Sequence, residues 1–315
     1  MSISMEFYHF CTIIGKEYLL KGLALHDSLE KHAKNFHLWI CCLDDISLQF
    51  LKRMNLKNVT LIPLESIEDD QLLSVKKSRT PHEYSFTLKS PLVLYILNNY
   101  NFVNSIMYID GDLYFYSDPK PILNQWGDGS VFICEQRLAK NIEDSGTYQA
   151  GLIGFKRDSN AFQCLEWWRT KCLEWCFHWH EEDLWTDQKY LNKWPELFSG
   201  VIISNDSGIN VGPWNEGNYE STPDFNVSNG EVYINNHKLV VYHFSGFVIL
   251  NELEFDLCNY CWVNEDTLNH VYIPYIRAIQ KAIGRVKSID DTFTYGFALR
   301  MSREKAIHYY KYSNN

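Results

Sequence analysis

Apolar runs alternate with amphipathic segments over the first part of the chain. Compact apolar runs at 7–14, 36–43 and 59–64 are typical of buried strands. Between them, residues 16–32 and 46–54 place their apolar side chains mostly at helical spacing. Strands that alternate with helices predict βαβ units and a parallel sheet with right-handed crossovers. We therefore expect an α/β fold in which helices flank a mainly parallel sheet.

The middle of the chain continues this pattern. Residues 69–81 are polar and predict a surface loop, and residues 83–100 predict a helix that leads into a strand at 105–109. Further apolar stretches predict strands at 130–135, 146–155 and 238–246 and an aromatic helix at 162–179. Ligands of such sheets collect at the carboxyl ends of the strands. Side chains that follow the strands are therefore the first candidates for a functional site.

Two carboxylates, Asp110 and Asp112, follow the strand at 105–109 and are separated by Gly111. Burying two anions is costly without a counter-charge, so a divalent cation with oxygen ligands fits this position. Glycine has no Cβ and would let a bulky phosphate approach the backbone. A plain Asp-Gly turn remains the alternative from the tripeptide alone.

Other strand ends and loops supply further candidates. Tyr18, in the loop after Thr12, can stack on a nucleobase or cover the first turn of a helix. Lys89 can face the carboxylates and bind phosphate, or lie in solvent. Gly151 would permit close approach of a sugar. His243, at the end of a late strand, has the position of a third metal ligand, with a core histidine as the alternative.

Composition narrows the class of protein. The 315 residues are 46% hydrophobic and 15% aromatic, enough for a large core, and disorder is not expected. The formal net charge of -10 argues against a nucleic-acid partner, which needs a basic footprint. We find neither the pattern of a signal peptide nor an apolar stretch long enough for a membrane span, and expect a cytoplasmic protein.

The nine cysteines are consistent with a reducing compartment, and we expect them to pack in the core as small hydrophobic side chains. The alternative is a structural zinc site that would draw on the following residues: Cys172, Cys176, His178, His180, Cys258 and Cys261.

Taken in order, these motifs resemble those of the nucleotide-sugar-dependent glycosyltransferases of the GT-A fold. The resemblance rests on Asp-x-Asp at 110–112, Asp-Gln at 187–188 and His-Phe-x-Gly at 243–246. The chain is similar to the retaining group that includes glycogenin and bacterial lipopolysaccharide hexosyltransferases. It looks closer still to bacterial surface-polysaccharide transferases, and the stretches that carry this likeness are 86–91, 172–176, 187–191 and 213–215. The likeness covers about 7–250.

The resemblance implies roles for particular residues. Asp110, Asp112 and His243 would bind manganese or magnesium, and Asp187 and Gln188 would act beside the anomeric carbon. The donor-binding candidates are Thr12, Tyr18, Lys89, Asp110, Gly151 and Gly246. Trp214 and Asn215 are the acceptor-binding candidates, with Trp214 as a stacking surface for a sugar ring. The chain departs from the group where 247–249 reads Phe-Val-Ile instead of Lys-Pro-Trp, and where 149–151 reads Gln-Ala-Gly instead of Asn-x-Gly.

The implied reaction is transfer of a sugar from a nucleotide donor, a UDP-hexose, to a hydroxyl of a glycan or glycolipid in bacterial surface-polysaccharide synthesis. If configuration is retained, the acceptor attacks from the face of departure, or a covalent intermediate forms on Asp187. Two alternatives belong to other classes. One is a carbohydrate-binding protein with a degenerate transferase fold. The other is a phosphohydrolase of the haloacid-dehalogenase type, which also has Asp-x-Asp at a strand end.

We predict a GT-A domain over 1–250 and a C-terminal extension over 251–315. From residue 281 onward the chain has seven basic residues against three acidic ones, interleaved with aromatic side chains. This pattern suits a peripheral contact with anionic lipid at the inner face of the membrane. The alternatives are a helix docked on the core and a homodimer contact.

Overall fold

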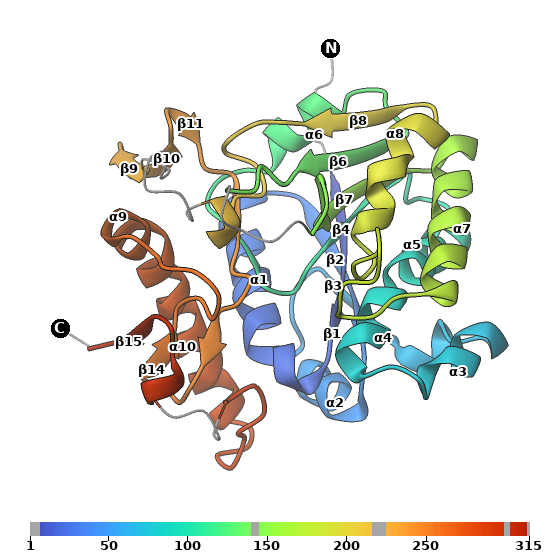
Figure 1. The fold of residues 1–315 in the computed structure, drawn as a ribbon. Helices are drawn as coiled ribbons and strands as arrows, with labels where there is room; N and C mark the ends of the chain where they lie inside the picture. Colours follow the sequence, from blue (N-terminus) through green and yellow to red (C-terminus); the bar gives the residue numbers. More distant parts are fainter. Residues whose placement is uncertain (1–6, 140–144, 216–224, 299–302, 314–315) are drawn as a thin grey trace.

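A seven-stranded sheet forms the centre of the protein (Figure 1). The computed structural model describes residues 7–139, 145–215, 225–298 and 303–313. The strand order is β3-β2-β1-β4-β7-β6-β8. In chain order these strands are β1 (Tyr8–Ile14), β2 (Phe36–Cys42), β3 (Val59–Pro63), β4 (Ser105–Ile109), β6 (Val131–Glu135), β7 (Tyr148–Lys156) and β8 (Val201–Ser204).

The sheet is mostly parallel, as the alternation of strands and helices predicts. Strand β1 pairs in parallel with β2 and with β4, and the pairs β2–β3 and β6–β8 are also parallel. Strand β7 runs antiparallel to both β4 and β6. The predicted α/β class with a mainly parallel sheet is therefore confirmed.

Helices cover both faces of this sheet (Figure 1). Alternate residues of β4 enter opposite cores. Met107 and Ile109 pack on the side of α1 (Leu19–His32), and Ile106 and Tyr108 pack on the side of α5 (Lys89–Asn99) and α7 (Ser159–Glu174). The α-helices are α1 (Leu19–His32), α2 (Asp45–Met54), α3 (Asp70–Lys76), α4 (Pro81–Thr87), α5 (Lys89–Asn99), α6 (Lys120–Trp126), α7 (Ser159–Glu174), α8 (Trp194–Leu197), α9 (Glu265–Thr267) and α10 (Ile273–Lys287).

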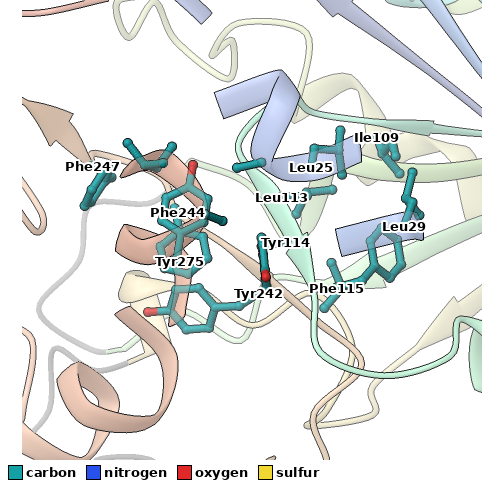
Figure 2. Packing of buried hydrophobic residues seen from close by; sticks show 14 of the residues in the cluster. Leu25, Leu29, Ile109, Leu113, Tyr114, Phe115, Tyr242, Phe244, Phe247 and Tyr275 are labelled. Atoms are coloured by element: carbon teal, nitrogen blue, oxygen red, sulfur yellow. The ribbon is translucent and has the colours of Figure 1, made fainter. Parts of the chain in front are cut away.

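A two-stranded ribbon beside the sheet connects distant parts of the chain. Strand β5 (Leu113–Phe115) pairs antiparallel with β12 (Val241–His243), and His243 lies opposite Leu113. Figure 2 shows this ribbon packed between α1 and the C-terminal residues. The rings of Phe244 and Tyr275 stack at 3.6 Å between centroids. This packing holds the end of β12 beside the turn that follows β4.

Two local predictions in the segment before β4 are wrong. The predicted loop at 69–81 contains α3, because the Asp69 side chain accepts from the backbone N–H of Leu72 at 3.0 Å and caps the helix. The predicted single helix at 83–100 is two helices, α4 and α5, which meet at Leu88. Pro91 lacks an N–H donor and is tolerated in the first turn of the second helix.

Two later elements are shorter than predicted. The aromatic helix α7 ends at Glu174, before the second half of the aromatic run. The late strand is divided into β11 (His237–Lys238) and β12. Smaller elements complete the fold: η1 (Lys16–Tyr18), η2 (Leu64–Ser66), η3 (Lys189–Lys193), η4 (Pro213–Asn215), η5 (Leu268–Tyr272), η6 (Arg303–Lys305), β9 (Phe225–Ser228), β10 (Glu231–Ile234), β13 (Val248–Ile249), β14 (Glu254–Asp256) and β15 (Tyr309–Lys311).

The C-terminal helix α10 lies along α1 (Figure 1). Asp27 of α1 pairs with Lys281 at 2.7 Å and with Arg285 at 2.9 Å. Two further basic residues pair with carboxylates: Lys287 with Glu252 and Arg303 with Glu254. Four of the basic side chains behind the membrane hypothesis therefore have protein partners. Membrane contact, a dimer contact and the domain boundary at residue 250 stay predictions.

Across the part of the chain that the structure describes, no helix is both long and apolar enough to cross a bilayer.

Candidate functional site

The turn after β4 places two carboxylates at the carboxyl edge of the sheet. The Asp110 N–H donates to Gly151 O on β7 at 2.8 Å, and the Leu113 N–H donates back to Asp110 O at 3.1 Å. Asp112 is fixed from the other side, because its backbone oxygen accepts from the Phe244 N–H at 2.9 Å. The backbone of both residues is thus held by hydrogen bonds to elements that are distant in sequence, and this fixes where their side chains begin.

His243 completes a cluster with these carboxylates. Its Nε2 lies 3.1 Å from Asp112 Oδ1 and 3.9 Å from Asp110 Oδ2. One ligand atom from each of the three side chains lies within 4.8 Å of the others. The His243 Nδ1 is buried without a hydrogen-bond partner among the described residues. Two carboxylates and an imidazole suit a divalent ion such as manganese or magnesium, so the predicted metal-binding group fits the geometry.

Gly151 closes the cluster from the side of β7. A Cβ at this position would lie 2.6 Å from His243 Cε1 and 2.8 Å from Asp110 Oδ2, which is closer than real Cβ contacts. A side chain at this position would therefore displace the imidazole or the carboxylate. The groups that lie close to Gly151 belong to the protein, and the predicted approach of a sugar stays a prediction.

Lys89 links the cluster to Asp187. Its Nζ lies 3.3 Å from Asp110 Oδ1 and 3.1 Å from Asp187 Oδ2, and it donates to Ala150 O at 3.1 Å. Burial alone would lower the pKa of Lys89, but the two carboxylates outweigh it and raise that pKa above its usual range. Lys89 is thus a fixed ammonium whose three donors have protein partners. Its predicted contact with donor phosphate stays a prediction.

The Gln188 side chain binds groups of the protein. Its Oε1 accepts from the backbone N–H of Ala150 at 3.1 Å, and its Nε2 donates to Ser145 O at 3.0 Å. The amide therefore supports β7 next to Gly151. Asp187 is 1% exposed and reaches the carboxylate cluster through Lys89.

The remaining donor-binding candidates divide into two groups. Tyr18 lies at the site, because a Cβ on Gly111 would be 3.7 Å from its Cδ1. Burial and the charges of Asp112 and Asp110 raise the pKa of the Tyr18 hydroxyl. Thr12 is fully buried in β1, and Gly246 has a φ of +76° and contacts the C-terminal segment. The predicted contact of these two residues with the donor stays a prediction.

The two acceptor-binding candidates are turned inward. Trp214 is 2% exposed and packs edge-on against the His243 ring at 5.3 Å between centroids. The Asn215 amide donates to Gln136 O at 3.1 Å and Arg137 O at 2.9 Å. Both side chains therefore have structural partners, and their contact with an acceptor stays a prediction.

Sequence reasoning missed two residues of the site. Lys21 of α1 places its Nζ 3.6 Å from Asp112 Oδ2, and the Tyr108 hydroxyl donates to Asp110 Oδ1 at 2.9 Å. Burial opposes ionisation of Asp112, but His243 and Lys21 outweigh it and hold the Asp112 pKa below its usual range. For Lys21, the sequence offered one signal: a lysine on the apolar face of a predicted amphipathic helix.

The cysteines agree with the core-packing interpretation. All nine are buried and none forms a disulfide, and the Sγ atoms of Cys258 and Cys261 lie 3.3 Å apart. Within the described ranges, the groups of three or more potential metal ligands contain no cysteine. A second such group, formed by His26, Asp27 and Glu30, lies where Asp27 already pairs with Lys281 and Arg285 of α10.

Comparison with solved structures identifies the fold. The galactosyltransferase LgtC, solved with donor and acceptor sugar analogues, matches 89% of this chain and 95% of its own with a TM-score of 0.51 and 12% identity. GlyE of Streptococcus pneumoniae TIGR4 matches 94% of this chain and 67% of its own at a TM-score of 0.50 and 12% identity. The bifunctional WbbM matches 90% of this chain and 52% of its own with a TM-score of 0.50 and 17% identity. The resemblance to the GT-A fold is confirmed.

Comparison of sequences identifies the family, although no family model matches the chain. YfnD of Bacillus subtilis (strain 168) is 31% identical over 300 residues, which cover 93% of this chain and 95% of YfnD. YfnF of the same strain is 32% identical over 305 residues, which cover 92% of this chain and 97% of YfnF. The chain is therefore a GT-A-fold protein that belongs to the family of YfnD and YfnF.

Proposed function

We propose that the protein is a metal-dependent glycosyltransferase that moves a sugar from a nucleoside diphosphate donor, a UDP-hexose, to a hydroxyl of a glycan or glycolipid. The observation that supports this most is the meeting of three carboxylates and an imidazole at the carboxyl edge of β4. Asp110, Asp112 and His243 form the metal-binding group, and Asp187 joins them through Lys89. The solved complex of LgtC, which shares the fold, holds donor and acceptor sugar analogues.

The roles of the first three residues follow from their chemistry. Asp110, Asp112 and His243 would hold manganese or magnesium, which when bound supplies positive charge against the negative charge that develops on the departing nucleoside diphosphate. Lys89 keeps Asp110 and Asp187 at a fixed spacing, because its ammonium contacts both carboxylates. Such fixed charges need no reorganisation during the reaction.

Asp187 is the residue we place beside the reacting carbon. Its carboxylate is buried next to Asp110 and can stabilise positive charge on the sugar as the donor bond breaks. Gln188 supports this position by holding β7 at Ala150. We propose retention of configuration, either through attack from the face of departure or through a covalent intermediate on Asp187.

The setting we propose comes from the sequence resemblance: synthesis of bacterial surface polysaccharide, on the cytoplasmic side of the membrane. The haloacid-dehalogenase alternative loses its support, because that motif belongs on a first strand and Asp110 here follows β4 of a GT-A fold. The carbohydrate-binding alternative shares the fold and must be separated by a measurement of turnover.

We expect the protein to hydrolyse one nucleotide sugar slowly in the absence of acceptor, and to do so only with a divalent metal. A panel of UDP-, GDP-, ADP- and CDP-sugars should be incubated with manganese, and nucleoside diphosphate release measured. EDTA should abolish the release and excess manganese should restore it, because the ion stabilises the leaving group. Binding of a nucleotide sugar in calorimetry with no turnover, even with candidate acceptors, would favour a binding protein.

We expect His243→Ala to weaken manganese binding by about 10-fold or more, since even supporting residues of metal sites often contribute that much. Manganese affinity should be measured without nucleotide, by the loss of the free-ion paramagnetic resonance signal. His237→Ala is a matched control, because His237 is exposed on β11. Wild-type manganese affinity in His243→Ala would make His243 a core histidine.

A further inference from the structure

Lys21 is a largely buried lysine with a single carboxylate neighbour among the described residues. It is 9% exposed and lies in the first turn of α1, and that turn contains no acidic residue. Among the described residues its Nζ has one carboxylate neighbour, Asp112 Oδ2 at 3.6 Å, and lies 4.7 Å from the centre of the Tyr18 ring. An ammonium offers three donors, so donors remain for a ligand beside the contact with Asp112.

The surroundings of Lys21 favour an anion. The N-terminal end of a helix has positive potential, so a lysine in the first turn adds a like charge there. Lys89 shows the contrast, because its ammonium is enclosed by Asp110, Asp187 and Ala150 O. Within the described ranges, Lys21 has no such enclosure. The remaining donors and the positive helix end together suit oxygen atoms of a negatively charged ligand.

The position of Lys21 indicates which anion this is. Its Nζ lies near both the Tyr18 ring and Asp112. Under the proposed function, on which this inference rests, Asp112 is at the metal, and the stacking role predicted from the sequence puts Tyr18 at the nucleobase. The two phosphates of a nucleoside diphosphate span the space between base and metal. A divalent ion at Asp112 would repel the Lys21 ammonium, and phosphate oxygens between them would relieve that repulsion.

We propose that Lys21 is a donor-binding residue that holds the diphosphate of the nucleotide, in the donor and in the departing nucleoside diphosphate. The alternative is a counter-ion that only neutralises Asp112. The two roles predict different nucleoside diphosphate affinities when the charge is removed: a residue that holds the diphosphate predicts a loss, and a counter-ion of Asp112 predicts none. A diphosphate ligand would lose affinity, whereas manganese alone would bind as well as before or better, because a positive charge beside its carboxylate is gone.

The test compares Lys21→Gln with wild-type protein by calorimetry, with the nucleoside diphosphate that wild type binds most tightly out of UDP, GDP, ADP and CDP. At saturating manganese we expect affinity for it to fall about 10-fold or more, as for loss of one charged hydrogen bond. Affinity for manganese alone should be unchanged or higher. Lys21→Arg should recover most of the nucleoside diphosphate affinity. Lys31→Gln is the control, because Lys31 is exposed near the far end of α1.

Two results would overturn the proposal: wild-type nucleoside diphosphate affinity in Lys21→Gln, or parallel loss of manganese affinity. If Lys21→Gln does not fold, a crystal structure of wild type with manganese and nucleoside diphosphate decides. A Lys21 Nζ beyond hydrogen-bond distance of every phosphate oxygen would reject the role. Failure of wild type to bind any of the four nucleotides would instead reject the proposed function.

Discussion

Asp110→Asn and Asp112→Asn should each lower the rate of metal-dependent sugar transfer by about 100-fold or more, which corresponds to about 2.7 kcal/mol of activation free energy. Each substitution removes one negative charge from a group of three potential ligands. An amide oxygen is a poorer ligand for a hard divalent ion than a carboxylate. The loss should therefore appear first as weaker manganese binding and then as lost turnover.

The two variants should differ in stability. Asp112 is buried and pairs with His243 and Lys21, so Asp112→Asn leaves the Lys21 ammonium without its carboxylate neighbour. Asp110 is more exposed, and its partner Lys89 keeps Asp187 after the substitution. We expect a lower thermal midpoint for Asp112→Asn and a midpoint near wild type for Asp110→Asn.

Manganese titrations and initial rates on both variants provide the measurement. Asp128→Asn is the matched control, because Asp128 is exposed in the loop after α6. Near-native turnover of either variant in manganese would show that the metal site has been misplaced.

The sequence predicted the fold because its hydrophobic pattern follows the sheet. The apolar runs that form β1, β2 and β3 are compact, and the segments between them have apolar residues at helical spacing. Periodicity alone therefore indicates βαβ units. The segment at 69–81 failed because its composition is polar. The helix α3 buries little apolar surface, and its start depends on the capping side chain of Asp69.

The cluster of Asp110, Asp112 and His243 was predictable because strand ends of one sheet edge meet in space. The pairing of β5 with β12 brings residue 243 beside residue 112, although 130 positions separate them. Lys21 was not predictable in the same way. Its place at Asp112 depends on how α1 packs on the sheet, and helical spacing does not specify that orientation.

The sequence also did not predict which partners the side chains of loop residues would bind. Gln188 and Asn215 are polar residues in irregular segments, and both amides bind backbone groups of neighbouring elements. Residue type predicts that such amides will be hydrogen-bonded when buried, but not whether the partner is a ligand or the protein. Asp187 is informative because Lys89 ties it to the predicted metal ligands.

Asp187→Asn should lower the chemical rate of transfer by about 100-fold or more while leaving nucleoside diphosphate affinity within about 3-fold of wild type. Asp187 is separated from the metal-binding group by Lys89, so its loss leaves the three proposed ligands in place. A carboxylate that stabilises positive charge on the sugar acts mainly in the transition state. Asparagine keeps the shape of the side chain and removes that charge.

Single-turnover rates with donor and acceptor, and calorimetry with nucleoside diphosphate and manganese, should be measured on the same preparations. Asp183→Asn is the matched control, because Asp183 is an exposed aspartate of the same loop. A fall in the single-turnover rate with unchanged nucleotide affinity places Asp187 at the sugar. A large loss of nucleoside diphosphate affinity with an unchanged rate would instead place Asp187 at the nucleotide.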